Sequence, residues 1–167
     1  DIEDLRYAAS VRKLPIGIQD FVGLRQDGYL YVDKTEAIHR LVTTGKVYFL
    51  SRPRRFGKSL LVSTLGALFE GRRELFEGLW IAKEHEGIEA WQFEAGPVVR
   101  LDMNAKEYGQ GRGFLLDHLA MQLEANARRL ELTLRGTDPA AQFATLLADA
   151  HAQRGMRVAV LVDEYDK

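Results

Sequence analysis

Apolar residues along this chain occur either in short uninterrupted runs or in longer segments at helical spacing, and the two kinds alternate. Three short runs, at 47–50, 97–103 and 158–162, predict strands that are covered on both faces of a sheet. Apolar spacing of three and four predicts helices over 35–44, 60–69, 114–132 and 139–153. Strands that alternate with helices of this length are typical of a parallel α/β sheet with right-handed crossovers, flanked by helices.

A further short strand is predicted at 29–32, where apolar and aromatic residues cluster after a glycine. Asp33 then has the position of a helix cap for 35–44, and Glu36 is expected to complete a capping box by reaching back to the cap N–H. Gly45 is the expected stop of that helix. We interpret Asp33 as a cap in preference to a nucleotide contact.

Composition places this pattern in one soluble domain. The chain has 167 residues, of which 46% are hydrophobic, so it has enough apolar mass for a core. We expect residues 1–13 to form an N-terminal arm and residues 14–167 to form the folded part. No apolar run approaches the roughly 20 residues that span a bilayer, so we expect no membrane partner.

Charge and cysteine content exclude several classes of protein. The 23 basic and 24 acidic residues leave a net charge of −1, which excludes the overall positive field of a general nucleic-acid binder. Any anion site must therefore be local. The chain has no cysteine, which excludes disulfides, thiolate metal sites and a cysteine nucleophile, and permits a reducing compartment. We expect a cytoplasmic protein.

The segment between strand 47–50 and helix 60–69 has the pattern of a phosphate-binding loop. In such a loop, backbone N–H groups surround an anion at the positive end of a helix dipole. A lysine reaches the outer phosphates, and a Ser or Thr hydroxyl ligates Mg²⁺. Arg52 stands where the pattern G-x-x-x-x-G-K-[S/T] has its first glycine. The predicted nucleotide-binding residues are Arg54, Arg55, Phe56, Gly57, Lys58, Ser59 and Leu60, with Lys58 also catalytic and Ser59 a Mg²⁺ ligand.

The partner of such a loop is an apolar strand that ends in an acidic residue, and strand 158–162 is followed by Asp163 and Glu164. Asp163 is the predicted second Mg²⁺ ligand, and Glu164 is the predicted general base that polarises the attacking water. Alone, Lys58 would be read as a solvated lysine and Asp163–Glu164 as a turn with a helix cap. Their occurrence together, in this context, favours a nucleoside-triphosphate site.

Other interpretations of the same residues stay open. Arg54 and Arg55 suit phosphates and surface carboxylates equally, because the guanidinium fork binds both. With Arg52 and Lys58 they form a basic patch that leaves contact with nucleic acid open, although no interleaved aromatic residues support it. The aromatic residues Trp80, Trp91 and Phe93 are interpreted as packing residues in preference to base-stacking ones.

The chain resembles the bacterial and archaeal AAA-ATPase-like family of P-loop proteins. The resemblance rests on four segments, Leu14–Gly17, Tyr31–Thr35, Ser51–Leu60 and Leu161–Asp166. In that family Arg-Pro-Arg-Arg-Phe-Gly-Lys-Ser is the usual form of the loop, so Arg52 fits it. The resemblance implies ATP as the nucleotide and a P-loop NTPase fold of the additional-strand class.

The resemblance also implies elements that would follow residue 167. These are the additional strand, sensor residues, an arginine finger and often a PD-(D/E)XK nuclease-like domain. We therefore expect this chain to be a fragment whose sheet is incomplete at the C-terminus.

Two hypotheses of different class follow. One is a regulatory module that binds and hydrolyses Mg-ATP, and so is an ATPase when full length. The alternative is a non-hydrolysing nucleotide-binding or interaction module attached to a nuclease-like effector domain. A P-loop kinase is a weaker option, because adjacent Asp163 and Glu164 favour water as the nucleophile. Neither the oligomeric state nor the pathway is indicated by the residues.

Overall fold

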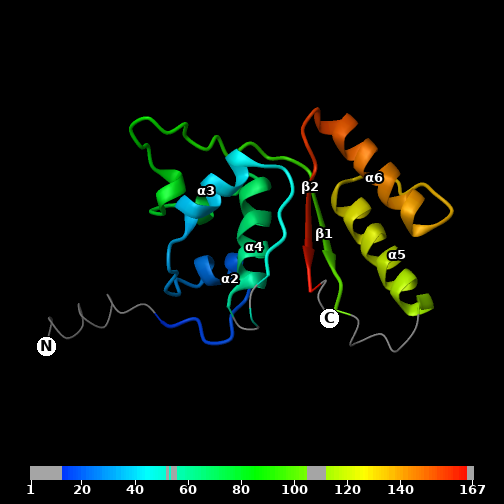
Figure 1. Ribbon diagram of the computed structural model, residues 1–167, viewed down its shortest axis with the longest axis horizontal. Helices are drawn as coiled ribbons and strands as arrows, with labels where there is room; N and C mark the ends of the chain where they lie inside the picture. Colours follow the sequence, from blue (N-terminus) through cyan, green and yellow to red (C-terminus); the bar gives the residue numbers. More distant parts are fainter. Residues whose placement is uncertain (1–12, 52, 54–55, 105–111, 165–167) are drawn as a thin grey trace, which may run out of the picture. The chain divides into compact units, whose positions relative to one another are not determined.

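The computed structural model describes residues 13–51, 53, 56–104 and 112–164 (Figure 1). The chain divides into two compact units. The first comprises Asp1–Ala67 and Arg72–Gln92, and the second comprises Leu68–Gly71 and Phe93–Lys167. Each unit is described by itself.

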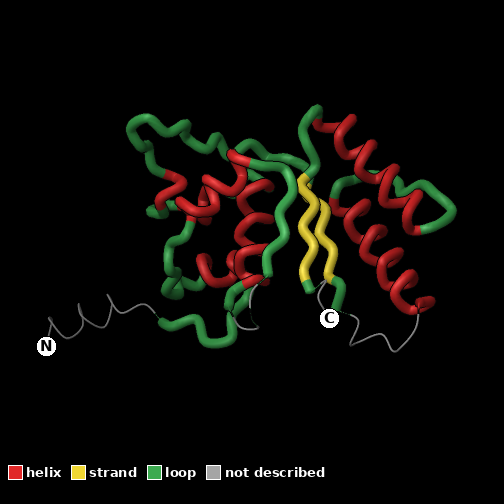
Figure 2. The backbone as a smooth tube through the Cα atoms, viewed as in Figure 1, coloured by secondary structure: helices red, strands yellow, loops and turns green. Residues whose placement is uncertain are grey.

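The first unit is helical in its described residues (Figures 1 and 2). Its elements are α2 (Phe21–Gln26), α3 (Thr35–Thr44), α4 (Lys58–Phe69), and the 3₁₀ turns η1 (Arg73–Phe76) and η2 (Trp80–Ala82). The predicted helix 35–44 is confirmed, and the predicted helix 60–69 begins two residues earlier than expected. The fully buried Phe21 ring packs at 4.9 Å from Phe76 and 5.1 Å from Tyr31, between centroids.

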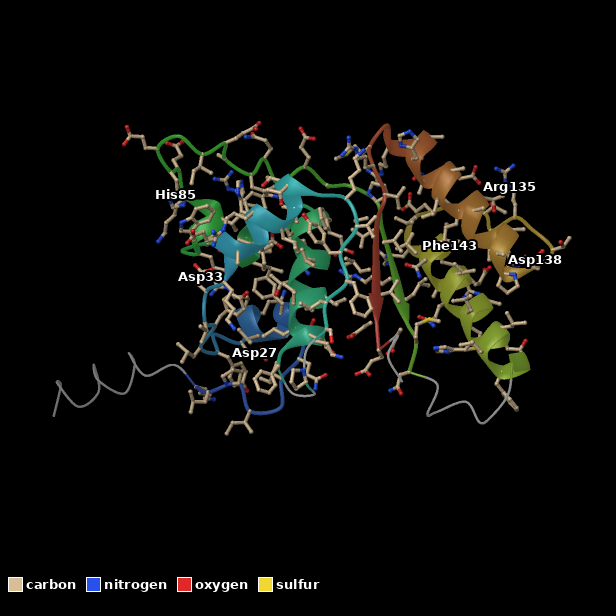
Figure 3. The ribbon with its side chains drawn as sticks, viewed as in Figure 1. Asp27, Asp33, His85, Arg135, Asp138 and Phe143 are labelled. Carbon is tan, nitrogen blue, oxygen red and sulfur yellow. The ribbon has the colours of Figure 1, made fainter. Side chains whose placement is uncertain are left out.

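Asp33 joins the start of α3 to η2 (Figure 3). Its Oδ1 accepts hydrogen bonds from the Thr35 N–H at 2.8 Å and the Thr35 hydroxyl at 2.6 Å. Its Oδ2 accepts the Trp80 N–H at 2.7 Å. The Asp33 carboxylate thus accepts the first N–H of α3, as expected, but Lys34 and not Asp33 occupies the N-cap position. The predicted capping box does not form, because Glu36 pairs with Arg40 one turn on, at 3.7 Å, instead of reaching back.

These contacts give Asp33 a pH-dependent role. Burial acts to raise the pKa of its carboxyl, but hydrogen bonds from Thr35 and the Trp80 N–H, with the charge of Lys83, outweigh burial and lower the pKa below its ordinary 3.8. A carboxyl whose pKa is lowered by folding stabilises the fold above its unfolded pKa, and this contribution is lost as the pH falls through the folded value.

We expect Asp33→Asn to lower the free energy of unfolding by about 0.5–2 kcal/mol at pH 7, as loss of a cap does. The difference from the unaltered protein should shrink below about pH 4, where the carboxylate becomes protonated. Urea denaturation at pH 7 and at low pH measures both values. Asp27→Asn, at an exposed aspartate on the same unit (Figure 3), is the control and should show little change at either pH. If Asp33→Asn lowers the free energy of unfolding equally at both pH values, the pH-dependent role of the Asp33 carboxylate is contradicted.

The second unit contains a parallel pair of strands, β1 (Val98–Asp102) and β2 (Ala159–Asp163), with the helices α5 (Arg112–Arg129) and α6 (Pro139–Arg154) (Figure 2). All four elements were predicted within a few residues, and the predicted parallel pairing is confirmed. Asp138 caps α6 through bonds to two N–H groups of its first turn, and Gly155 ends α6 with φ +64°. The core of this unit comprises Val99, Leu101, Leu123, Ala127 and Leu146.

Two predicted strands do not form. In the described residues the sheet has two strands, and residues 29–32 and 47–50 belong to neither. The Tyr29 and Leu30 N–H groups bond singly to the Leu24 and Lys13 carbonyls, at 3.0 and 2.9 Å, and build no ladder. In the run at 47–50, Val47 is 91% and Phe49 74% exposed. An apolar run becomes a strand only where a neighbouring strand bonds its backbone, and no local pattern encodes that neighbour.

Candidate functional site

The N-terminal turn of α4 carries the last residues of the predicted phosphate loop. Gly57 directly precedes the helix with φ +76°, a left-handed conformation that favours glycine. Its carbonyl accepts the Leu61 N–H at 3.0 Å, which is the first bond of the helix. The N–H groups of Lys58, Ser59 and Leu60 therefore precede the first N–H that donates within the helix, that of Leu61, and lie at the positive end of the helix dipole. This turn can bind an anion with its backbone while Lys58 adds a full positive charge.

Hydroxyl groups one turn further along α4 fix this helix within the first unit. The Ser63 hydroxyl donates to Asp20 Oδ1 at 2.8 Å and accepts the Phe21 N–H at 2.9 Å, so α4 takes part in the start of α2. Thr64 is fully buried, and its hydroxyl donates to the Leu60 carbonyl at 2.7 Å. Burial raises the pKa of Tyr31, against the opposing effect of the Thr64 hydroxyl. The turn that carries Lys58 is thus held by polar contacts as well as by packing.

The carboxyl end of β2 carries the two acidic residues of the second predicted motif. Glu164 follows the strand with φ +57°, an uncommon conformation for a non-glycine residue, and its N–H bonds Asp163 Oδ1 at 2.9 Å. The Asp163 carbonyl accepts the Met103 N–H at 2.9 Å. Strained backbone of this kind concentrates at functional sites.

The structure adds Asp102, which the sequence analysis did not single out. Asp102 is the last residue of β1 and lies in register with Asp163. The signal for it was present, because strand 97–103 also ends near an acidic residue and the carboxyl ends of parallel strands meet at one edge. Two carboxylates therefore lie at the same end of this strand pair.

The predicted site residues are thus located in two groups. Gly57, Lys58, Ser59 and Leu60 lie at the start of α4, in the first unit, with Phe56 63% exposed beside them. Asp163 and Glu164 lie at the end of β2, in the second unit. The predicted Arg54 and Arg55, like Arg52, lie outside the described residues.

The donor groups fit magnesium chemistry. Mg²⁺ prefers hard oxygen ligands and is commonly held by one or two protein groups together with phosphate oxygens. The Ser59 hydroxyl and the Asp163 carboxylate are donors of this type. Over the described ranges, no three His, Asp or Glu side chains lie close enough to hold a metal ion by themselves.

Among the helices that the structure describes, none combines the length and apolar character needed to cross a bilayer.

Comparison with known proteins gives the family. The chain is 42% identical over 160 residues to "Uncharacterized protein in vnfD 5'region" of Azotobacter chroococcum mcd 1, an alignment that covers 95% of this chain and 30% of that relative. The chain thus spans about a third of the relative's length. No solved structure matches the chain. The family described as "Predicted AAA-ATPase" matches residues 15–167. This chain therefore belongs to the predicted AAA-ATPase family.

Proposed function

We propose that this chain binds Mg-ATP and hydrolyses it as part of a regulatory module. The observation that carries the proposal is the start of α4, where Gly57 adopts a left-handed conformation directly before Lys58 and Ser59. This arrangement presents backbone N–H groups, a cation and a hydroxyl at one helix end, which together suit a nucleotide triphosphate and its metal. Membership of a predicted ATPase family supports the same function.

Each site residue has a chemical role in this proposal. Gly57 to Leu60 supply N–H groups to the phosphates, and Lys58 neutralises the charge that develops on the transferred phosphoryl group. Ser59 and Asp163 hold Mg²⁺, directly or through water. Glu164 polarises the attacking water. Arg54 and Arg55 add phosphate contacts.

The same proposal covers the fold class and the partner. We infer a P-loop NTPase of the additional-strand class, in which a further strand adjoins the Asp163 strand. In the family that this chain resembles, a nuclease-like domain often follows the ATPase part. We propose that ATP hydrolysis regulates such a downstream domain. Adenine is proposed on the family alone.

Calorimetric titration of Mg-ATP and Mg-GTP tests the proposal. We expect saturable binding of Mg-ATP and weaker binding of Mg-GTP. Lys58→Ala should weaken Mg-ATP binding by about tenfold or more, because each lost charge-assisted bond costs about 1.5–3 kcal/mol. Lys46→Ala, at an exposed lysine, is the matched control and should bind like the unaltered protein.

The outcomes separate the two hypotheses. Absence of Mg-ATP binding by the folded protein would contradict nucleotide binding altogether. Binding that depends on Lys58, without release of phosphate by the full-length protein, would favour the non-hydrolysing module over the ATPase.

A further inference from the structure

The edge of β1 that faces away from β2 is bonded by side chains of α5. The Ala159 N–H bonds the Pro97 carbonyl and the Met103 N–H bonds the Asp163 carbonyl, so odd-numbered residues of this segment face β2. The backbone N–H and C=O groups of the even-numbered Arg100 and Asp102 point away from β2. Without partners, these groups would form an open sheet edge.

Two side-chain amides of α5 each bond one of these residues at both its N–H and its C=O. Asn126 accepts the Arg100 N–H at 2.9 Å and donates to the Arg100 carbonyl at 2.7 Å. Gln122 accepts the Asp102 N–H at 2.5 Å and donates to the Asp102 carbonyl at 2.8 Å. Arg129 continues the row by donating to the Val98 carbonyl.

The repeat lengths of the two elements explain this match. Residues four apart on a helix are separated by about 6 Å along its axis, and residues two apart on a strand by about 6.6 Å. An α5 that runs antiparallel to β1 can therefore place Gln122 beside Asp102 and Asn126 beside Arg100. The side chains of α5 bond β1 where a neighbouring strand would.

The bonds of Gln122 lead directly to the second group of site residues. Gln122 bonds both backbone groups of Asp102, and the ring of His118 also contacts the Asp102 carbonyl, with Nε2 at 2.9 Å. The next residue, Met103, donates to the Asp163 carbonyl at 2.9 Å. The end of β2, which carries Asp163 and Glu164, is thus connected to α5 through Asp102, the last residue of β1, and Met103, which follows it.

We propose that Gln122 is a positioning residue for Asp163 and Glu164, acting through the backbone of Asp102 and Met103. This inference rests on the proposed function, because the position of Asp163 matters only if it holds Mg²⁺. Asn126 provides an internal comparison. It makes the same pair of bonds two residues upstream on β1 and is 5% exposed, so it closes the sheet edge without touching the strand end.

The test uses Gln122→Leu, which keeps the size of the side chain and removes both bonds. In the full-length protein we expect the Mg²⁺ concentration for half-maximal ATP hydrolysis to rise about tenfold, while ATP binding without Mg²⁺ stays unchanged. Gln122→Glu retains an acceptor for the Asp102 N–H and loses the donor to its carbonyl, so its effect should be intermediate. Gln153→Leu, at an exposed glutamine of α6, is the matched control and should leave the Mg²⁺ dependence unchanged.

Amide hydrogen exchange gives a readout that does not need activity. In Gln122→Leu the Met103 N–H should exchange at least about tenfold faster, because exchange follows local opening. The Ala159 N–H, at the opposite end of the strand pair, should stay protected. Unchanged Met103 exchange, or an unchanged Mg²⁺ dependence with a lowered melting temperature, would overturn the positioning role. Failure of the proposed function shows separately, as absence of Mg-ATP binding by the unaltered protein.

Discussion

Replacement of Glu164 by glutamine is expected to lower the rate of ATP hydrolysis by about 100-fold or more, the usual contribution of a positioned general base. Glutamine has nearly the same shape as glutamate and cannot take a proton from water. Mg-ATP binding should therefore stay close to that of the unaltered protein. Phosphate release by the full-length protein at saturating Mg-ATP measures the first effect, and calorimetry measures the second.

Glu131→Gln is the matched control for this experiment. Glu131 lies in the same unit as Glu164 and shares its left-handed backbone, with φ +58° against +57°. The substitution removes the same charge from the same backbone conformation and should leave hydrolysis unchanged. Turnover that Glu164→Gln does not reduce would exclude Glu164 as the base. A loss of Mg-ATP binding in this variant would mean that Glu164 acts on the metal or the fold instead.

Replacement of Gly71 by alanine is expected to destabilise the protein by about 2–5 kcal/mol, because a left-handed backbone costs about 1–2 kcal/mol and overpacking about 1–3. Gly71 ends α4 with φ +73°. A Cβ there would lie 2.6 Å from the Phe93 carbonyl oxygen and 2.9 Å from the Ala95 nitrogen. Both contacts are backbone atoms, and the neighbouring Gly96 N–H bonds the Phe69 carbonyl at 2.8 Å, so the segment cannot move aside without losing a bond.

Gly78→Ala separates the two contributions. Gly78 has φ +78°, nearly the same as Gly71, and open space where its Cβ would lie. Gly78→Ala should therefore lower the free energy of unfolding only by the cost of the left-handed backbone, about 1–2 kcal/mol. Urea denaturation of both variants gives the difference, which is the cost of the close approach at Gly71. Equal losses of unfolding free energy in the two variants would show that residues 93–95 move away from the new Cβ without a cost in stability.

The sequence located those parts of the candidate site that consist of neighbouring residues. Gly57, Lys58 and Ser59 are consecutive, and the structure places them at the start of a helix as the motif requires. Asp163 follows from an apolar strand that ends in an acid. Asp102 and Gln122 were not singled out in this way, because the roles proposed for them depend on bonds across 20 residues and on a register between strands. A pair of amides four residues apart on a helix, as at 122 and 126, is a signal that could have been noticed.

By itself, the sequence determined the four longer helices, with ends to within a few residues, and located the two segments that pair among four candidate strands. Apolar spacing, caps such as Asp138 and stops such as Gly155 act within a few residues of where they stand, so they can be read locally. The tertiary structure alone decided which apolar runs become strands. Residues 159–163 pair with β1, whereas the equally apolar 47–50 has no ladder among the described residues. The physical reason is that a strand is completed by hydrogen bonds to a distant segment, while a helix completes its own.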